Sequence, residues 1–142
     1  MSDTMTQILV GLLCGYAGYG LRVGREASDR RRKFRADIRN SIDSLLAHEN
    51  VGLLAAYKAS VPIIKLKCNE VWSDVFLWKR RRMERAKDEY CGLKDGQVDP
   101  LKANAAEFIG TMTNEERTQA WQQSRKRLKN ALENLERSAA FW

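Results

Sequence analysis

The chain has 142 residues, enough for one domain and too few for two ordinary ones. A composition that is 44% hydrophobic and 30% charged argues against wholesale disorder, and three widely spaced cysteines without a C-x-x-C pair argue against a disulfide framework or a zinc site. Residues with high helix propensity dominate and strand-like alternation is nearly absent, which predicts an all-α fold. The net charge of +7 indicates an anionic partner but does not distinguish lipid from nucleic acid.

The first predicted element is an uncharged segment from Met5 to Leu21. Its 17 residues lie at the lower limit for crossing a hydrocarbon core of about 30 Å. Arg22 can extend the span by reaching toward the phosphates, and Tyr16 and Tyr19 lie where interfacial aromatic residues are common. We therefore predict a transmembrane anchor over residues 1–24. A buried first helix of a soluble bundle and a cleaved signal peptide are the alternatives, although a signal peptide would carry its positive charge before the apolar run.

The charge around this segment is asymmetric, with one acid before it and a dense set of bases after it. The positive-inside rule then predicts a single pass through the inner (cytoplasmic) membrane, with the N-terminus outside. Residues 25–142 become a basic, cytoplasmic helical domain. Bases this close to a bilayer are expected to attract anionic lipid headgroups. They are Arg22, Arg25, Arg30, Arg31, Arg32, Lys33 and Arg35.

Glycines within the segment recur at helical spacing. Gly11 and Gly15 form a G-x-x-x-G pair, and Gly18 lies seven residues after Gly11. Small residues on one face let two helix backbones approach closely, so the spacing predicts self-association of the segment. The alternative is that glycine is simply common in membrane helices.

The body of the chain continues with helical periods. A narrow apolar stripe follows the arginine-rich stretch and predicts a helix to about Ala47. A second apolar stretch begins at Val51, where Ser60-Val61-Pro62 either caps a new helix or kinks a longer one. The hydrophobic stretch after it is the predicted core. The stripe comprises Phe34, Ile38, Ile42, Leu45 and Leu46, and the core comprises Ile64, Cys68, Val71 and Val75, broadened by Leu66, Trp72, Phe76 and Trp78.

A basic run then covers Lys79, Arg80, Arg81 and Arg82. It could hold the phosphates of DNA or RNA, but no helix-turn-helix signature accompanies it, and the leading interpretation is a charged helix face exposed to solvent. The helix that carries the run is predicted to end at Gly92, as a C-cap.

The remaining elements follow a linker at about residues 92–100. We predict a short helix over residues 101–109, and then a last helix that opens with a capping box between Thr113 and Glu116. Four large apolar residues seven apart predict helix–helix packing along the last helix. The stripe packs either on the protein's own core or, alternatively, in a coiled coil. Its members are Trp121, Leu128, Leu135 and Trp142.

The layout resembles a loosely defined group of uncharacterised bacterial proteins with a single membrane-anchoring helix. In that group the anchor runs into an arginine-rich helix, an apolar helix, a basic run and an aromatic residue before Cys-Gly. The resemblance covers roughly residues 8–92 and implies the architecture without implying an activity. This chain departs from the pattern at Lys87, where the group often has an aromatic residue. The matching motifs are Lys33-Phe34-Arg35, Ala59-Ser60-Val61-Pro62, Lys79 to Arg82, and Glu89-Tyr90-Cys91-Gly92.

The sequence offers little catalytic chemistry. It has no nucleotide-binding glycine loop, and its single histidine, His48, lies at a predicted helix end, where it fits a structural role. We therefore expect no enzyme activity, no cofactor and no metal site. The leading hypothesis is a membrane-anchored helical protein that self-associates or scaffolds a partner protein at the cytoplasmic face. The alternative is a membrane-tethered helical module that binds nucleic acid.

Overall fold

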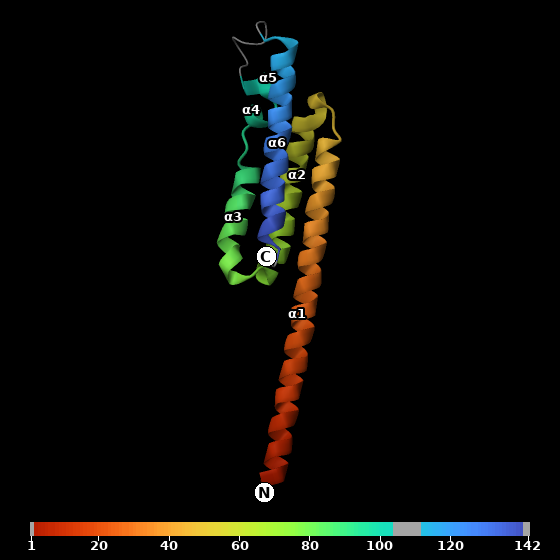
Figure 1. Ribbon diagram of the computed structural model, residues 1–142, viewed down its shortest axis with the longest axis vertical. Helices are drawn as coiled ribbons and strands as arrows, with labels where there is room; N and C mark the ends of the chain where they lie inside the picture. Colours follow the sequence, from red (N-terminus) through yellow and green to blue (C-terminus); the bar gives the residue numbers. More distant parts are fainter. Residues whose placement is uncertain (1, 104–111, 141–142) are drawn as a thin grey trace.

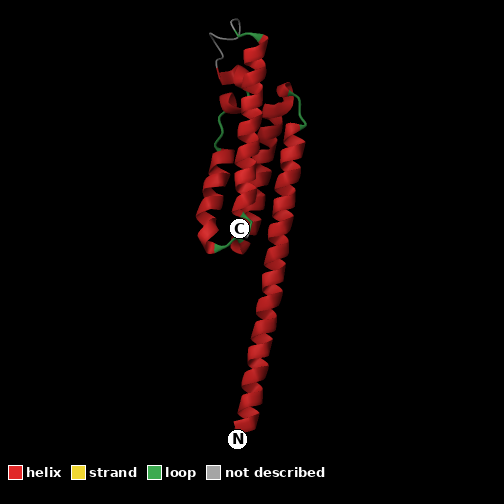
Figure 2. Ribbon diagram, viewed as in Figure 1, coloured by secondary structure: helices red, strands yellow, loops and turns green. Residues whose placement is uncertain are grey.

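The computed structural model describes residues 2–103 and 112–140, and every regular element in that part of the chain is a helix (Figures 1 and 2). The predicted all-α class is therefore confirmed. The elements are α1 (Ser2–Leu46), α2 (Asn50–Val71), the short 3-10 helix η1 (Trp72–Asp74), α3 (Leu77–Cys91), α4 (Asp95–Val98), α5 (Pro100–Ala103) and α6 (Asn114–Ser138).

Helix α1 has 45 residues and divides into two halves with different surroundings. At 1.5 Å per residue it is about 68 Å long. The first half, which we call the projecting half and define as residues 4–26, extends beyond the rest of the molecule and is exposed along its length (Figure 1). The second half packs against α2 and α6. The helix runs without a break through residues 24 and 25, where the sequence predicts a domain boundary.

The predicted transmembrane anchor is wrong. In the described part of the chain, no helix combines the length and the apolar character that crossing a membrane requires. The uncharged run is short, and Thr6 and Gln7 near its start and Tyr16, Tyr19 and the glycines in its second part dilute its hydropathy. The same finding contradicts the predicted localisation, which was a single pass through the inner membrane with the N-terminus outside and a cytoplasmic body.

The bundle consists of the second half of α1 with α2, α3 and α6. Helix α6 packs against both α1 and α3, and α2 packs against α1 and α3, so the four helices enclose one core (Figure 1). The core draws on the apolar stripes that the sequence shows at helical spacing, because burying apolar area is the main favourable term in folding. Its largest fully buried side chains include Ile38, Leu53, Ile64, Met83, Tyr90, Leu128, Leu132 and Leu135.

Helix α2 continues through Pro62, so the Ser-Val-Pro step neither starts a helix nor ends one. Pro62 lies on the exposed side of α2, where water can satisfy the carbonyl that loses its helical partner. Two large residues expected to broaden the core, Leu66 and Trp78, are instead exposed. Helix α2 is thus apolar on both faces, and the bundle covers one of them.

The predicted helix ends agree with the structure in two places. The Thr113 hydroxyl accepts from the Glu116 amide at 3.2 Å, and the Glu116 carboxylate accepts from the Thr113 amide at 2.8 Å, which confirms the capping box. Gly92 is the C-cap of α3. The predicted linker at 92–100 contains α4 and the buried Val98. Of the predicted helix at 101–109, the structure describes residues up to Ala103, which end α5, and the rest lies outside the described residues.

Candidate functional site

The projecting half of α1 exposes apolar side chains on every side. Leu12 is 66% exposed and Tyr16 is 80% exposed, although both belong to the uncharged run. A helix that is hydrophobic all round is normally buried, so this surface is the most unusual feature of the molecule.

One face of the projecting half carries six of its large residues, and a neighbouring face carries three glycines. At 100° per residue, six large residues spaced three or four apart fall on one face, which we call the apolar ridge. Gly11, Gly15 and Gly18 fall about a quarter turn away, and a Cβ atom added at any of them would meet no other atom within 4 Å. The sequence interpretation found the glycine face and missed the ridge, which its spacing could have revealed. The ridge comprises Met5, Ile8, Leu12, Tyr16, Tyr19 and Val23.

Many of the basic residues that follow the projecting half make contacts within the fold. Arg30 and Arg31 are the first of them. Arg30 makes two hydrogen bonds to the Asp74 carboxylate, at 2.6 and 2.8 Å, and the Asp74 side chain is only 7% exposed. The hydrogen bond to Asp74 raises the pKa of Arg30. Arg31 donates to the Asp74 carbonyl at 2.6 Å and lies over the Phe76 ring, 4.5 Å from its centroid. These two arginines therefore fix α1 to the turn between α2 and α3.

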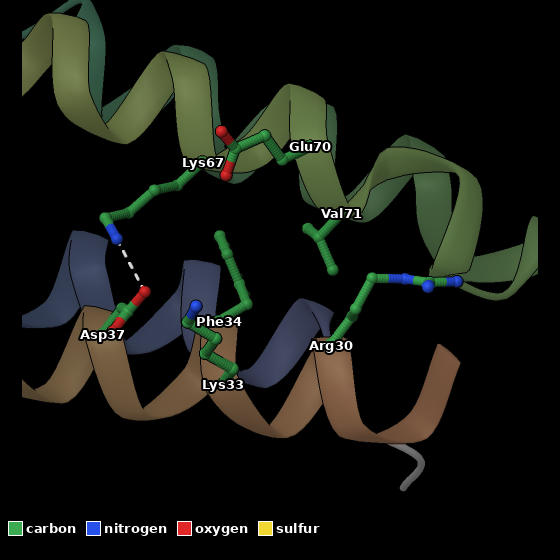
Figure 3. A pocket seen from close by; sticks show the side chains of 7 residues that line it. All are labelled: Arg30, Lys33, Phe34, Asp37, Lys67, Glu70 and Val71. Atoms are coloured by element: carbon green, nitrogen blue, oxygen red, sulfur yellow. Dashed lines mark hydrogen bonds and ion pairs between the residues drawn. The ribbon is translucent and has the colours of Figure 1, made fainter. Parts of the chain in front are cut away.

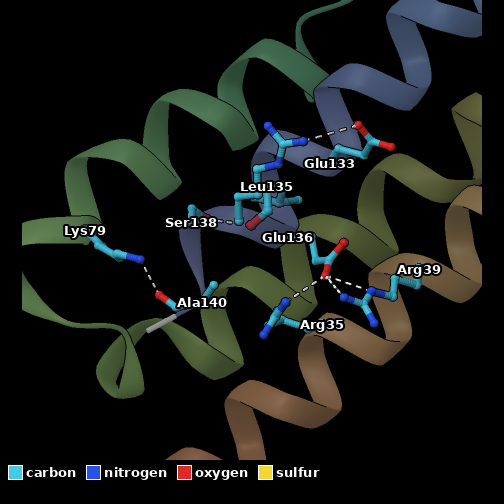
Figure 4. Close-up of polar contacts among 9 residues, drawn as sticks. Arg35, Arg39, Lys79, Glu133, Leu135, Glu136, Ser138 and Ala140 are labelled. Carbon is cyan, nitrogen blue, oxygen red and sulfur yellow. Dashed lines mark hydrogen bonds and ion pairs between the residues drawn. The ribbon is translucent and has the colours of Figure 1, made fainter. Parts of the chain in front are cut away.

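Glu136 of α6 forms a second clamp on α1 (Figure 4). Its Oε1 atom lies 3.2 Å from Arg35 Nη2 and 2.7 Å from Arg39 Nη2, and the Glu136 side chain is almost buried. Two guanidinium groups converging on one carboxylate hold α1 and α6 in register.

The other bases predicted to attract anionic lipid lie at the surface. Arg22 pairs with Glu26 one helical turn away, at 3.2 Å. Arg25, Arg32 and Lys33 are exposed. Only part of the predicted anionic-lipid set is therefore available to an outside partner.

The basic run at the start of α3 divides in the same way. Lys79 is buried and donates to the Ala140 carbonyl near the chain end, and burial lowers the pKa of Lys79 (Figure 4). Arg80 donates to the carbonyls of Ser73 and Val75, at 3.1 and 3.2 Å. Arg81 and Arg82 are exposed. Two of the four residues predicted to contact nucleic acid, Lys79 and Arg80, thus make hydrogen bonds to the protein's own backbone.

Arg125 of α6 has a structural role that the sequence interpretation missed. It donates to the carbonyls of Leu46 and His48, at 2.7 and 2.6 Å, and to the side-chain oxygen of Asn50. The His48 ring donates from Nδ1 to the Ser44 carbonyl, at 2.8 Å, since a carbonyl can only accept. Together they satisfy carbonyls at and just after the end of α1. No local sequence pattern predicts a cap from Arg125, because it lies 79 residues from Leu46 and 77 from His48.

The stripe predicted on α6 lies inside the bundle. Trp121, Leu128 and Leu135 are buried in the core, and Trp142 lies outside the described residues.

Comparison of the chain with protein-family models, with curated proteins and with solved structures found no match.

Proposed function

We propose that the protein is a non-enzymatic assembly module, which self-associates through the projecting half of α1 and presents its helical bundle outward. The observation that supports this most directly is the exposure, along the projecting half, of the uncharged and largely apolar run from Met5 to Leu21. Covering that surface with protein removes apolar area from water, at roughly 25 cal/mol per Å².

The construction of α1 supports the same proposal. The clamps at Asp74 and Glu136 fix the second half of α1 to the bundle. Because helix α1 is continuous, holding one half also holds the other in a fixed direction away from the bundle (Figure 1). A surface presented in advance loses less conformational entropy on association than a disordered segment would.

The test compares full-length variants by sedimentation velocity over a series of concentrations. We expect the wild-type chain to form a defined oligomer and Leu12→Asp to be monomeric, because a charge on the ridge would be buried without a partner. Leu77→Asp is the matched control, since Leu77 is 74% exposed but belongs to the bundle.

A second pair of variants examines the glycine face. Gly15→Ile should weaken association, because a branched side chain holds the two backbones apart. Ala17→Ile is the control, because Ala17 is exposed and lies about 160° around the helix from Gly15 and about 100° from Tyr16 of the ridge. Gly15 has open space around it in the isolated chain. A wild-type chain that stays monomeric at every concentration contradicts the proposed function.

A further inference from the structure

A second unpartnered apolar surface lies on the bundle, along the outer face of α2. Ile63 and Leu66 are 52% and 60% exposed, and they continue a stripe of apolar residues at helical spacing. The bundle covers the opposite face of α2, so this stripe contributes nothing to the core. The stripe comprises Val51, Ala55, Ala59, Ile63 and Leu66.

The stripe borders a groove between α1 and α2, with a volume of about 420 Å³. Small side chains on both helices, among them Ser41, Ser44, Ala56 and Ala59, leave the groove open. Asp37 and Lys67 also line it, but they pair with each other at 2.6 Å (Figure 3). The groove therefore accepts large apolar side chains without stranding a charge.

We propose that this groove receives the apolar ridge of the projecting half of a second copy of the chain, in an antiparallel dimer. The inference rests on the proposed function and assigns the surface that covers the ridge.

Shape and chemistry match on the two sides. The ridge from Ile8 to Val23 and the stripe from Val51 to Leu66 each span 16 residues, or about 24 Å of helix. The ridge offers large side chains and no charge. The groove is lined by small Ser and Ala side chains, by larger apolar ones such as Ile63, by polar Asn40 and His48, and by the Asp37–Lys67 ion pair. Large residues entering a row of small ones is the packing that helices adopt when ridges fill grooves.

The antiparallel arrangement follows from the continuity of α1. Two α1 helices lying side by side in opposite directions place each projecting half along the other copy's bundle, next to the groove that α1 itself lines (Figure 1). Both contacts then form at once and are related by a two-fold axis. Parallel pairing of the two projecting halves would leave both α2 stripes exposed.

The area is sufficient for a stable dimer. A fully buried aromatic side chain removes about 150–250 Å² from water, and each ridge carries two tyrosines and four large aliphatic residues. Two symmetric contacts of this size, counted on both sides, reach the roughly 1,600 Å² of a standard interface. The central stretch of α1 mixes Glu26 and Asp29 with Arg25 and Arg32, so bases and acids of the two copies can pair where the helices cross.

Disulfide trapping between two differently tagged full-length chains tests the arrangement. One chain carries Tyr16→Cys and the other Ala59→Cys, both in a Cys14→Ser background. We expect a mixed disulfide dimer to form under mild oxidation. Native Cys14 serves as the control for direction, because it lies about 160° around the helix from Tyr16 and should trap poorly against Ala59→Cys. The Cys14→Ser chain alone sets the background from the other two cysteines.

A second measurement does not depend on oxidation. Ile63→Asp should weaken self-association by about 100-fold, while Leu77→Asp should leave it unchanged. Unchanged circular dichroism spectra would show that both variants fold.

The outcomes separate the two proposals. An oligomeric chain that traps Tyr16→Cys only against Tyr16→Cys, and that tolerates Ile63→Asp, overturns the groove and leaves the proposed function standing. A chain that is monomeric before any substitution overturns both.

Discussion

The two halves of α1 belong to one helix, yet the sequence gives them opposite relations to the bundle. The second half carries one apolar stripe through Phe34, Ile38 and Ile42, and this stripe packs into the core. The first half carries apolar side chains on several faces instead of along one stripe, and these side chains are exposed in the single chain. An amphipathic helix can bury its apolar stripe in its own domain and keep its polar face in water. A helix that is apolar on several faces needs a partner to cover the faces that its own domain does not.

The charges follow the same division. In the second half, Arg30, Arg35 and Arg39 bind carboxylates from α6 and from the turn after α2. In the first half, Arg22 meets only Glu26 on its own helix. The arginines therefore lock one half in place and leave the other free to associate.

The largest expected difference in stability is between truncating a leucine in the bundle core and truncating one in the projecting half. Leu128→Ala should lower the free energy of unfolding by about 3 kcal/mol, because it leaves a cavity in a closed core. Leu12→Ala should change the same quantity by less than about 0.5 kcal/mol at concentrations where the chain is monomeric. Urea denaturation followed by circular dichroism measures both. Equal losses would mean that the projecting half is part of the cooperative unit.

Alkaline pH should act on the bundle alone. Burial raises the pKa of the Tyr90 phenol to about 12, and that of the Cys68 thiol to about 12. Because each pKa lies above its ordinary value of 10.0 or 9.0, the stability it contributes is fully present below those values and is lost as the pH rises toward 12.

We therefore expect a loss on the order of 2 kcal/mol between pH 8 and pH 10, seen as a falling thermal midpoint. Cys68→Ala should make the fall shallower and Leu12→Ala should leave it unaltered. A midpoint that stays constant over this range contradicts the prediction.

The ion pairs offer a finer comparison. Glu136→Gln removes the carboxylate charge that Arg35 and Arg39 share in a nearly buried position, and it should lower the free energy of unfolding by about 1–2 kcal/mol. Glu26→Gln removes an exposed pair on the projecting half and should change it by less than about 0.5 kcal/mol. Thermal unfolding at low and high salt checks both variants, and a larger loss for Glu26→Gln would reverse the assignment of the clamp.

The last comparison concerns two glycines, one in each region. A Cβ atom at Gly92 would lie 2.7 Å from the Asp88 carbonyl oxygen, so Gly92→Ala should destabilise the bundle by about 1 kcal/mol. Gly24 has open space around it, so Gly24→Ala should favour the helix by about 1 kcal/mol. Hydrogen exchange of backbone amides resolves the two effects by region. Weaker protection in the projecting half of Gly24→Ala would contradict the prediction.

The sequence predicted the helical class, the capping box at Thr113 and the cap at Gly92, because these depend on propensity and on residues within one or two turns. It also marked most of the bundle's apolar stripes by their spacing. It did not predict that Leu66 and Trp78 would be exposed, because the spacing of the apolar residues along α2 and at the start of α3 gives no sign of which of them the bundle covers.

The sequence by itself determined that the chain is helical, basic and interrupted by an uncharged apolar run at its start. Only the tertiary structure decided that this run projects from the bundle and that Arg30, Arg35 and Arg125 are structural clamps that join distant parts of the chain. The physical reason is the range of the interactions. Helix formation depends on neighbours within about four residues, whereas each clamp joins groups between 44 and 101 residues apart. Such partners become visible only when the helices are packed together.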